Sequence, residues 1–291
     1  MPESRQGLVV KNYSGFYYVK DQEGVIYTCK PRGKLKTQVL SGDKVKFTLL
    51  EDQQGVLEDV LPRRNQLERP RIANVDMVLI VMAYDKPAPN VMLLDRLLLL
   101  AYYNQIRPCI ILNKADLPKS EKARGIDYYP QAGFNFITAS ARTGWGMDAI
   151  ARVIKDKIAV MAGPSGAGKS SMLAKLTGDG SIKTQTVSSK IGRGRHTTRH
   201  VELYSLPGGG AIADTPGFSV LDVPPMKNQE LSWYYPDFTE HRESCQFRDC
   251  VHKNENVCGV KQAVAAGAIS ASRYENYLIL LEEVMEKERC Y

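Results

Sequence analysis

One glycine-rich segment has the spacing GxxxxGK[ST], which is typical of phosphate-binding loops. Its residues are Gly163, Pro164, Ser165, Gly166, Ala167, Gly168, Lys169 and Ser170. It follows the apolar stretch Ile158–Ala162, which predicts a strand, and it opens a helix predicted over Lys169–Leu176. Backbone N–H groups of such a loop surround phosphate oxygens. We therefore expect Lys169 to reach the β- and γ-phosphates as a catalytic residue, Ser170 to bind Mg²⁺, and Ser171 to join the nucleotide-binding residues. The alternative is a glycine-rich turn without a ligand.

A second motif, Asn113-Lys114-Ala115-Asp116, follows the predicted strand Pro108–Leu112. Ligands bind at the carboxyl ends of strands in open α/β sheets. The Asp116 carboxylate can accept hydrogen bonds from N1–H and the N2 amino group of guanine, whereas adenine offers neither donor. Asn113 is expected to hold the loop, and the Lys114 stem is expected to stack on the base. Four residues are weak evidence alone, but beside a phosphate loop they predict a guanine nucleotide.

The tripeptide Ser140-Ala141-Arg142 follows the predicted strand Asn135–Thr138. It resembles the short backbone loop that contacts guanine O6, so we expect Ser140 and Ala141 near the base. A plain turn at the end of a strand is the alternative.

A further motif, Asp214-Thr215-Pro216-Gly217, follows the predicted strand Gly210–Ala213. Asp214 is expected to hold Mg²⁺ through water, and the N–H of Gly217 is expected to bond the γ-phosphate as part of the catalytic set. Without its place after the phosphate loop, this segment would be interpreted as a Pro-Gly turn.

The basic segment 192–199 lies between these motifs and suits a switch loop. One of its adjacent threonines, Thr197 or Thr198, is expected to complete the Mg²⁺ shell, with Thr198 taken as the ligand. A solvated or RNA-contacting basic loop is the alternative.

Three cysteines and a histidine follow the spacing Cys245-x₄-Cys250-x-His252-x₅-Cys258. Three thiolates and an imidazole suit tetrahedral Zn²⁺, and the short spacings close a compact knuckle. A reduced cluster without metal and a Cys245–Cys250 disulfide are the alternatives. We expect one structural zinc ion.

The chain has 291 residues and a formal net charge of +7, and no apolar run approaches the roughly 18 residues of a membrane span. With no secretory segment at the N-terminus, the expectation is a soluble cytoplasmic protein. A basic balance favours a polyanionic partner, although ordinary surface charge explains it equally well. Basic clusters lie within 30–36 and 190–200, whereas the sequence from Glu230 onward is net acidic.

The pattern of elements changes twice along the chain. Five short strands with turns between them, one of them predicted over Lys44–Leu49, fill residues 1–61 and suit an OB-type barrel, with an SH3-like barrel as the alternative. Pro62–Gln66 is predicted to be a polar, basic linker. From Ala73 strands and helices alternate, as in a doubly wound α/β sheet, and the leucine-rich stretch Val91–Tyr103 predicts a helix. After Val220 the chain becomes helical around the cysteines, with helical stretches at Asn228–Tyr235 and Ala271–Lys287.

The order of the motifs identifies a family. In an ordinary GTPase the NKxD motif comes last, whereas here it precedes the phosphate loop, so the chain resembles a circularly permuted GTPase. The barrel, the cysteine spacing and the stretches GRHTT, YYPDF and CQFRDCVH…RYENY resemble the RsgA family, ribosome small subunit-dependent GTPase A. The resemblance covers nearly the whole chain, from about Gly7 to Glu288.

The resemblance implies an α/β fold in three domains. These are an OB-fold RNA-binding domain over 1–68, a circularly permuted P-loop GTPase domain over 69–222 and a helical zinc-binding domain over 223–291. It implies Mg²⁺-dependent GTP hydrolysis stimulated by the small ribosomal subunit during late assembly. The OB-fold and the zinc domain are the implied contacts to ribosomal RNA, in a monomeric protein that uses no membrane.

The sequence does not directly identify the residue that orients the water molecule attacking GTP. Ras-like enzymes orient it with a glutamine just after DxxG, but Phe218 stands here. His196 is the catalytic candidate because an imidazole can orient or accept a proton near pH 7. An RNA contact by His196 is the alternative. Arg199 stands where the family often has a third threonine, which leaves the Mg²⁺-binding threonine ambiguous.

Two rival functions follow from the same residues. Guanylate-kinase-like enzymes share the phosphate-loop sequence but lack NKxD and DxxG. A module that only binds RNA, with nucleotide tuning its affinity, would explain Phe218. A nucleoside monophosphate acceptor assay separates a kinase from a GTPase. Measuring GTP hydrolysis with and without small subunits separates a GTPase from an RNA-binding module.

Overall fold

A computed structural model describes residues 4–33, 35, 37–68, 70–178, 201–214 and 222–290, apart from the side chains of Lys122, Arg124 and Asp214. The chain divides into two compact units. The first unit comprises residues 1–79, 147–162 and 169–219, and the second comprises residues 80–146, 163–168 and 220–291. The boundaries of the three domains expected from sequence stay a prediction.

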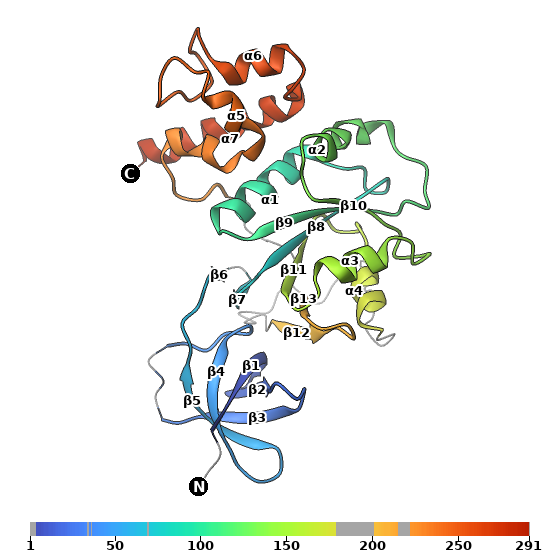
Figure 1. Cartoon of the computed structure of the whole chain (residues 1–291), viewed down its shortest axis with the longest axis vertical. Coiled ribbons are helices and arrows are strands. Elements are labelled where there is room, and N and C mark those ends of the chain that lie inside the picture. The colour runs from blue at the N-terminus through green and yellow to red at the C-terminus, as the bar shows by residue number, and fades with distance from the viewer. Residues whose placement is uncertain are drawn as a thin grey trace, which may run out of the picture. The chain divides into compact units, whose positions relative to one another are not determined.

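The first unit begins with a closed five-stranded barrel (Figure 1). Its strands are β1 (Ser4–Tyr13), β2 (Phe16–Lys20), β3 (Ile26–Pro31), β4 (Lys44–Leu49) and β5 (Gln54–Val60). The strands pair in the order β1-β2-β3-β5-β4, and β4 pairs back onto β1. The β3–β5 pair is parallel and the other four pairs are antiparallel. This topology is that of an OB-type barrel, so the SH3-like alternative is wrong.

Alternating residues of these strands fill the barrel. In β4, Val45 and Phe47 are completely buried while Lys44 and Lys46 are exposed, which is the period-2 pattern that one solvated and one buried face require. Gly55 lies so close to the interior that a Cβ there would be 2.8 Å from the Cys29 sulfur. Side-chain packing therefore fixes the register of the barrel.

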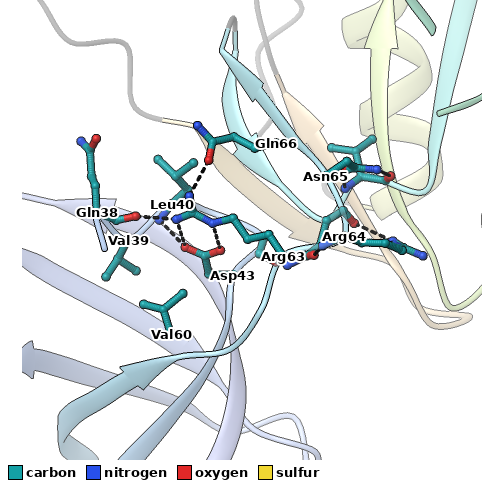
Figure 2. A network of polar contacts seen from close by, with 12 residues as sticks. Gln38, Val39, Leu40, Asp43, Val60, Arg63, Arg64, Asn65 and Gln66 are labelled. Atoms are coloured by element: carbon teal, nitrogen blue, oxygen red, sulfur yellow. Dashed lines mark hydrogen bonds and ion pairs between the residues drawn. The ribbon is translucent and has the colours of Figure 1, made fainter. Parts of the chain in front are cut away.

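The segment after the barrel is tied down by one buried ion pair (Figure 2). Arg63 donates from Nε to Oδ1 of Asp43 at 2.7 Å and from a terminal nitrogen to Oδ2 at 2.7 Å. Asp43 is completely buried, and its Oδ2 also accepts from the Leu40 N–H at 2.7 Å. The segment expected to be a polar linker thus leads into a hairpin, β6 (Gln66–Glu68) with β7 (Arg71–Ala73).

Replacing Arg63 with alanine should destabilise the barrel strongly. The change leaves the Asp43 carboxylate buried without its cation, which costs about 3–5 kcal/mol in comparable cases. Hydrogen exchange of the β1 and β4 amides measures the effect, and Arg64→Ala is the control because the Arg64 side chain is 61% exposed. Equal loss of protection in both variants would contradict the role of the buried pair.

The rest of the first unit is an α/β segment. Its elements are α3 (Met147–Val153), β11 (Ile158–Ala162), α4 (Lys169–Thr177), β12 (Glu202–Ser205) and β13 (Ala211–Asp214). β11 and β13 run parallel, and β12 pairs with β13 in the antiparallel sense. β12 also meets the barrel, because Lys11 pairs with Glu202 across β1 and β12 and the Ser41 hydroxyl donates to the Val201 carbonyl at 2.6 Å.

The chain passes into the second unit along β8 (Met77–Ala83), which is buried throughout. There follow α1 (Val91–Tyr103), β9 (Arg107–Asn113), the 3₁₀ segment η1 (Glu121–Asp127), α2 (Tyr128–Gln131) and β10 (Phe136–Thr138). β9 and β10 run parallel. α1 begins where sequence predicts, because the Asn90 side chain caps it by accepting from the Leu93 N–H at 3.0 Å.

The C-terminal part of the second unit is helical and packs on α1. It contains the 3₁₀ segments η2 (Asn228–Tyr234) and η3 (Pro236–Phe238) and the helices α5 (Thr239–Arg242), α6 (Gly259–Ala265) and α7 (Ala271–Arg289). Tyr235, Phe238 and Tyr277 form its aromatic centre, with ring centroids 4.9–5.0 Å apart. Among the described residues, no helix has the length and apolar character needed to cross a membrane.

A buried ionic cluster joins α7 to α1 and η3. Arg273 donates to Asp95 at 2.6 Å and makes two hydrogen bonds to Asp237, each of 3.0 Å. The Asn276 amide and the Tyr129 hydroxyl donate to Asp95 as well. Burial raises the pKa of Asp95, while the Arg273 guanidinium and these hydrogen bonds lower it. The cluster therefore satisfies charges that would otherwise be costly inside a protein.

Candidate functional site

The predicted nucleotide motifs all follow the carboxyl ends of parallel strands. Asn113 ends β9, Ser140 comes shortly after β10, Gly163 comes directly after β11, and Asp214 ends β13. Because loops at the carboxyl ends of parallel strands form the usual ligand site of an open α/β sheet, this placement suits nucleotide binding.

Asn113 links three loops of the second unit. Its side chain is buried, its Nδ2 donates to the carbonyl of Ala167 in the phosphate loop at 2.8 Å, and its Oδ1 accepts from the Ala141 N–H at 3.0 Å. An amide suits this position because it offers a donor and an acceptor at once. The base-recognition loops and the phosphate loop are thus held in one arrangement.

Two glycines of the phosphate loop permit close approaches that a side chain would prevent. At Gly168, with φ +98°, a Cβ would lie 2.3 Å from the Asn113 amide nitrogen. At Gly163, with φ +129°, it would lie 2.1 Å from the Val81 carbonyl oxygen. Between them, Ser165 and Gly166 are exposed, as a loop that receives a ligand requires.

Asp116 is oriented from both sides. Its Oδ1 accepts from the Ser140 hydroxyl at 2.5 Å, and its Oδ2 accepts from Arg142 Nε at 3.0 Å. The hydrogen bond from Ser140 is the largest cause that lowers the pKa of Asp116, so the carboxylate is ionised at neutral pH. The sequence did not predict that Arg142 pairs with Asp116, because the two residues lie in different loops and no local pattern connects them.

Lys114 and Ala115 complete the base-recognition loop. Lys114 lies in the left-handed region with φ +62°, and its Nζ donates to the Lys86 carbonyl. The Ala115 N–H donates to the Ala139 carbonyl at 3.0 Å, which fastens the loop to the end of β10.

The phosphate side of the site is described in part. Lys169, Ser170 and Ser171 form the first turn of α4, directly after Gly168. Asp214 is placed as the last residue of β13, without its side chain. Four other predicted site residues lie outside the described residues, namely His196, Thr197, Thr198 and Gly217.

The four predicted zinc ligands converge in the second unit. Their ligand atoms all lie within 4.8 Å of one another. The His252 Nδ1 is 3.5, 3.3 and 3.4 Å from the sulfurs of Cys245, Cys250 and Cys258, and the Cys245 and Cys258 sulfurs are 3.9 Å apart. Zn–S and Zn–N distances of about 2.3 and 2.0 Å imply tetrahedral edges of about 3.6 Å for N···S and 3.8 Å for S···S. The donor set therefore fits tetrahedral zinc.

The electrostatics of this cluster also suit a cation. Burial lowers the pKa of His252 to about 4, so the imidazole is neutral and able to bind metal at pH 7. Burial raises the pKa of the Cys250 and Cys258 thiols, so a nearby cation is needed to keep them as thiolates. All six cysteines are free, which excludes the Cys245–Cys250 disulfide.

Residues that sequence reasoning missed support the knuckle. The Glu255 carboxylate accepts from the N–H groups of Val251 and Lys253 at 2.7 and 2.8 Å. The Tyr277 and Tyr274 hydroxyls donate to the carbonyls of Val251 and His252 at 2.9 and 2.5 Å. Both tyrosines belong to the RYENY stretch, which contributed only to the family resemblance.

Comparisons with known proteins identify the family. The sequence pattern of the RsgA GTPase family matches residues 60–224, and that of the RsgA N-terminal domain matches residues 6–57. A relative named "Small ribosomal subunit biogenesis GTPase RsgA", from Carboxydothermus hydrogenoformans, is 46% identical over 98% of this chain and 99% of its own length. The relative of the same name from Moorella thermoacetica is 44% identical over 98% and 99% of the two chains.

Solved structures agree as well. YjeQ from Thermotoga maritima has a TM-score of 0.83 at 36% identity, covering 97% of this chain and 99% of its own. YloQ, described as a circularly permuted GTPase, has a TM-score of 0.81 at 34% identity, covering 98% and 96% of the two chains. The resemblance drawn from the motifs is therefore confirmed. This chain belongs to the RsgA GTPase family and is a circularly permuted GTPase.

Proposed function

We propose that the chain hydrolyses GTP during biogenesis of the small ribosomal subunit. The names of its relatives support this role. The observation that carries the nucleotide assignment is the Asn113 side chain, which bonds both the phosphate loop and the Ser140–Arg142 loop. It acts in the cytoplasm as a monomer.

The proposed partners are the small subunit and its ribosomal RNA, which stimulate hydrolysis. Residues 1–68 form the OB-fold domain, 69–222 the permuted GTPase domain and 223–291 the zinc-binding domain. RNA contacts come from the first and last of these. Lys30 and Arg32, at the end of β3 and just after it, support the first contact because phosphate binding needs clustered cations.

Different residues of the proposed nucleotide site bind the guanine base, the phosphates and Mg²⁺. Asp116 reads the guanine edge, Ser140 and Ala141 lie at the base, and the Lys114 stem packs on the ring. On the phosphate side, residues 163–168 supply backbone N–H groups, Lys169 neutralises the β- and γ-phosphates, and Ser171 completes the helix turn. Mg²⁺ would be held by Ser170, Thr198 or Thr197, and Asp214, and would neutralise charge on the phosphates.

Replacing His196 with alanine should remove most of the subunit-stimulated hydrolysis and leave nucleotide binding intact. Phe218 cannot orient water, and positioned general bases typically contribute a factor of about 10²–10⁴. Single-turnover GTP hydrolysis on small subunits measures the effect, with His200→Ala as the control from the same basic segment. If the His196 variant keeps full stimulated turnover, His196 is not catalytic, and the alternative that it contacts RNA is favoured.

The decisive experiment measures GTP hydrolysis by the full chain with and without purified small ribosomal subunits. We expect slow intrinsic turnover and strong stimulation by small subunits, with no stimulation by large subunits. Equal turnover in all three conditions would overturn the proposed partner while leaving the GTPase family intact.

The knuckle is proposed to hold one structural zinc ion through Cys245, Cys250, His252 and Cys258. Elemental analysis of the purified chain should give one zinc per chain, and Cys258→Ser should lose it. Cys290→Ser is the control, because Cys290 is an exposed free thiol outside the cluster. A full complement of zinc in the Cys258 variant would contradict the ligand set.

A further inference from the structure

A cleft of about 550 Å³ in the second unit is lined on one side by Cys245, Cys250 and His252 of the cysteine–histidine cluster. Two large aromatic side chains line it and are exposed to solvent, Trp233 to 61% and Phe247 to 53%. Single exposed apolar side chains are common on protein surfaces, but two on one cleft form a concentrated apolar surface. Neither side chain belongs to the predicted nucleotide site, so nucleotide binding does not explain this aromatic pair.

Both aromatic side chains stand on backbone that is held in place. Trp233 lies on η2, whose Leu231 belongs to the buried core together with residues of α7. Phe247 lies between Cys245 and Cys250, and its carbonyl accepts from the Cys250 N–H at 3.4 Å. Because this backbone is already ordered, ligand binding restricts only the two side chains.

The polar lining of the cleft suits a nucleotide. It includes Arg242 and Arg248, whose guanidinium groups can pair with phosphate or stack on a base, and the amides of Gln229 and Gln246. The lining also contains the Glu243 carboxylate, which is outnumbered by the two guanidinium groups. An amide offers both a donor and an acceptor, which matches the exposed edge of an unpaired base. The volume also lies within the range of about 300–1,000 Å³ that small-molecule sites occupy.

The net charge of residues 222–290 indicates which part of an RNA this cleft can bind. Residues 222–290 contain twelve Asp and Glu residues against eight Lys and Arg residues, a formal net charge of −4 in a chain of +7. An acidic surface repels an extended phosphate backbone, whose binding depends on many cations. The face of an unpaired base is uncharged, and stacking on aromatic rings accepts any base.

We propose that this cleft binds one unpaired base of an RNA, which stacks on Trp233 and Phe247 while Arg242 and Arg248 face its phosphate. The inference rests on the proposed function, in which ribosomal RNA is a partner. It assigns one contact with that RNA to the cleft. The zinc ligands at Cys245 and Cys250 hold the loop that carries Phe247, so the contact depends on the intact knuckle.

Trp233 itself provides the test. The chain contains two tryptophans, and Trp145→Phe leaves Trp233 as the single tryptophan, which can be excited selectively over tyrosine. In that background, a single-stranded octamer of adenylate should quench the fluorescence saturably, and the same octamer in a duplex should not. Phe247→Ala should weaken the binding about fivefold to a hundredfold, the range for loss of one stacked base. Ile279→Ala is the control, since Ile279 is an equally exposed apolar residue outside the cleft.

Three results would overturn the proposal. One is the absence of quenching by the single strand, and another is equal quenching by strand and duplex. The third is quenching by an arginine- and lysine-rich peptide but not by RNA, which would make a basic protein segment the occupant. If any of these occurs while small subunits still stimulate GTP hydrolysis, the cleft assignment fails and the proposed function stands. Zinc content confirms that each variant keeps its fold.

Discussion

Replacing Asp116 with asparagine should weaken GTP and GDP binding by about a hundredfold or more and create binding of xanthosine nucleotides. The carboxylate accepts two hydrogen bonds from guanine, and each hydrogen bond to a charged group contributes about 1.5–3 kcal/mol. An asparagine amide presents a donor where the guanine amino group also donates. Xanthine carries a carbonyl there and accepts that donor instead.

The control for this exchange is Arg142→Ala. Arg142 pairs with Asp116 at 3.0 Å, but its side chain is 77% exposed, so its removal should leave the preference for guanine unchanged. Fluorescent GDP and XDP analogues give both affinities. Unchanged GDP affinity in the Asp116 variant, without any gain for XDP, would show that another group reads the base.

Replacing Arg273 with methionine should cost about 3–5 kcal/mol of stability in the second unit. Arg273 is almost completely buried and neutralises Asp95 and Asp237, which are buried too. Removing one member of a buried ion cluster leaves uncompensated charge in a low-dielectric interior. Because the cluster joins α7 to α1, the loss should loosen the packing of the zinc-binding helices.

Urea unfolding followed by Trp233 fluorescence in the Trp145→Phe background measures this cost. Arg289→Met is the control, because Arg289 is an exposed residue in the last turn of the same helix. If both variants unfold at the same urea concentration as the parent, the cluster does not stabilise the packing of α7 on α1.

Strong local patterns made much of the fold predictable. The apolar run of β11, the alternating pattern of β4 and the capped, leucine-rich helix α1 have the bounds that sequence predicts, Ile158–Ala162, Lys44–Leu49 and Val91–Tyr103. Each pattern follows from residues within a single element. The cysteine spacing likewise predicted a cluster, which the convergence of the four ligand atoms supports.

Elements that depend on distant partners were not predictable. β12 has only four residues, and one of its partners is β1, almost 200 residues earlier in the chain. The β6–β7 hairpin begins at the last residue of the predicted linker, and its strands of three residues are too short to give a clear sequence pattern. Isolated hairpins of this size are not stable, so tertiary contacts decide whether they form.

The same limit applies to charged side chains. Asp95 lies in an apolar helix and Arg273 in a polar one, and neither has a local pattern that marks it as part of an ion pair. Their pairing could not be predicted because they are 178 positions apart. The Arg142–Asp116 pair joins two loops in the same way. Motifs identify which residues carry chemistry, whereas the partners that orient those residues come from the fold.

We expect separate loops of this permuted chain to form one site for a guanine nucleotide. Calorimetric titration of the full chain with GDP and with ADP, each with Mg²⁺, tests it most directly. The expected result is one saturable GDP site per chain and no measurable heat from ADP. Equal binding of the two nucleotides, or no binding of GDP, would contradict the account.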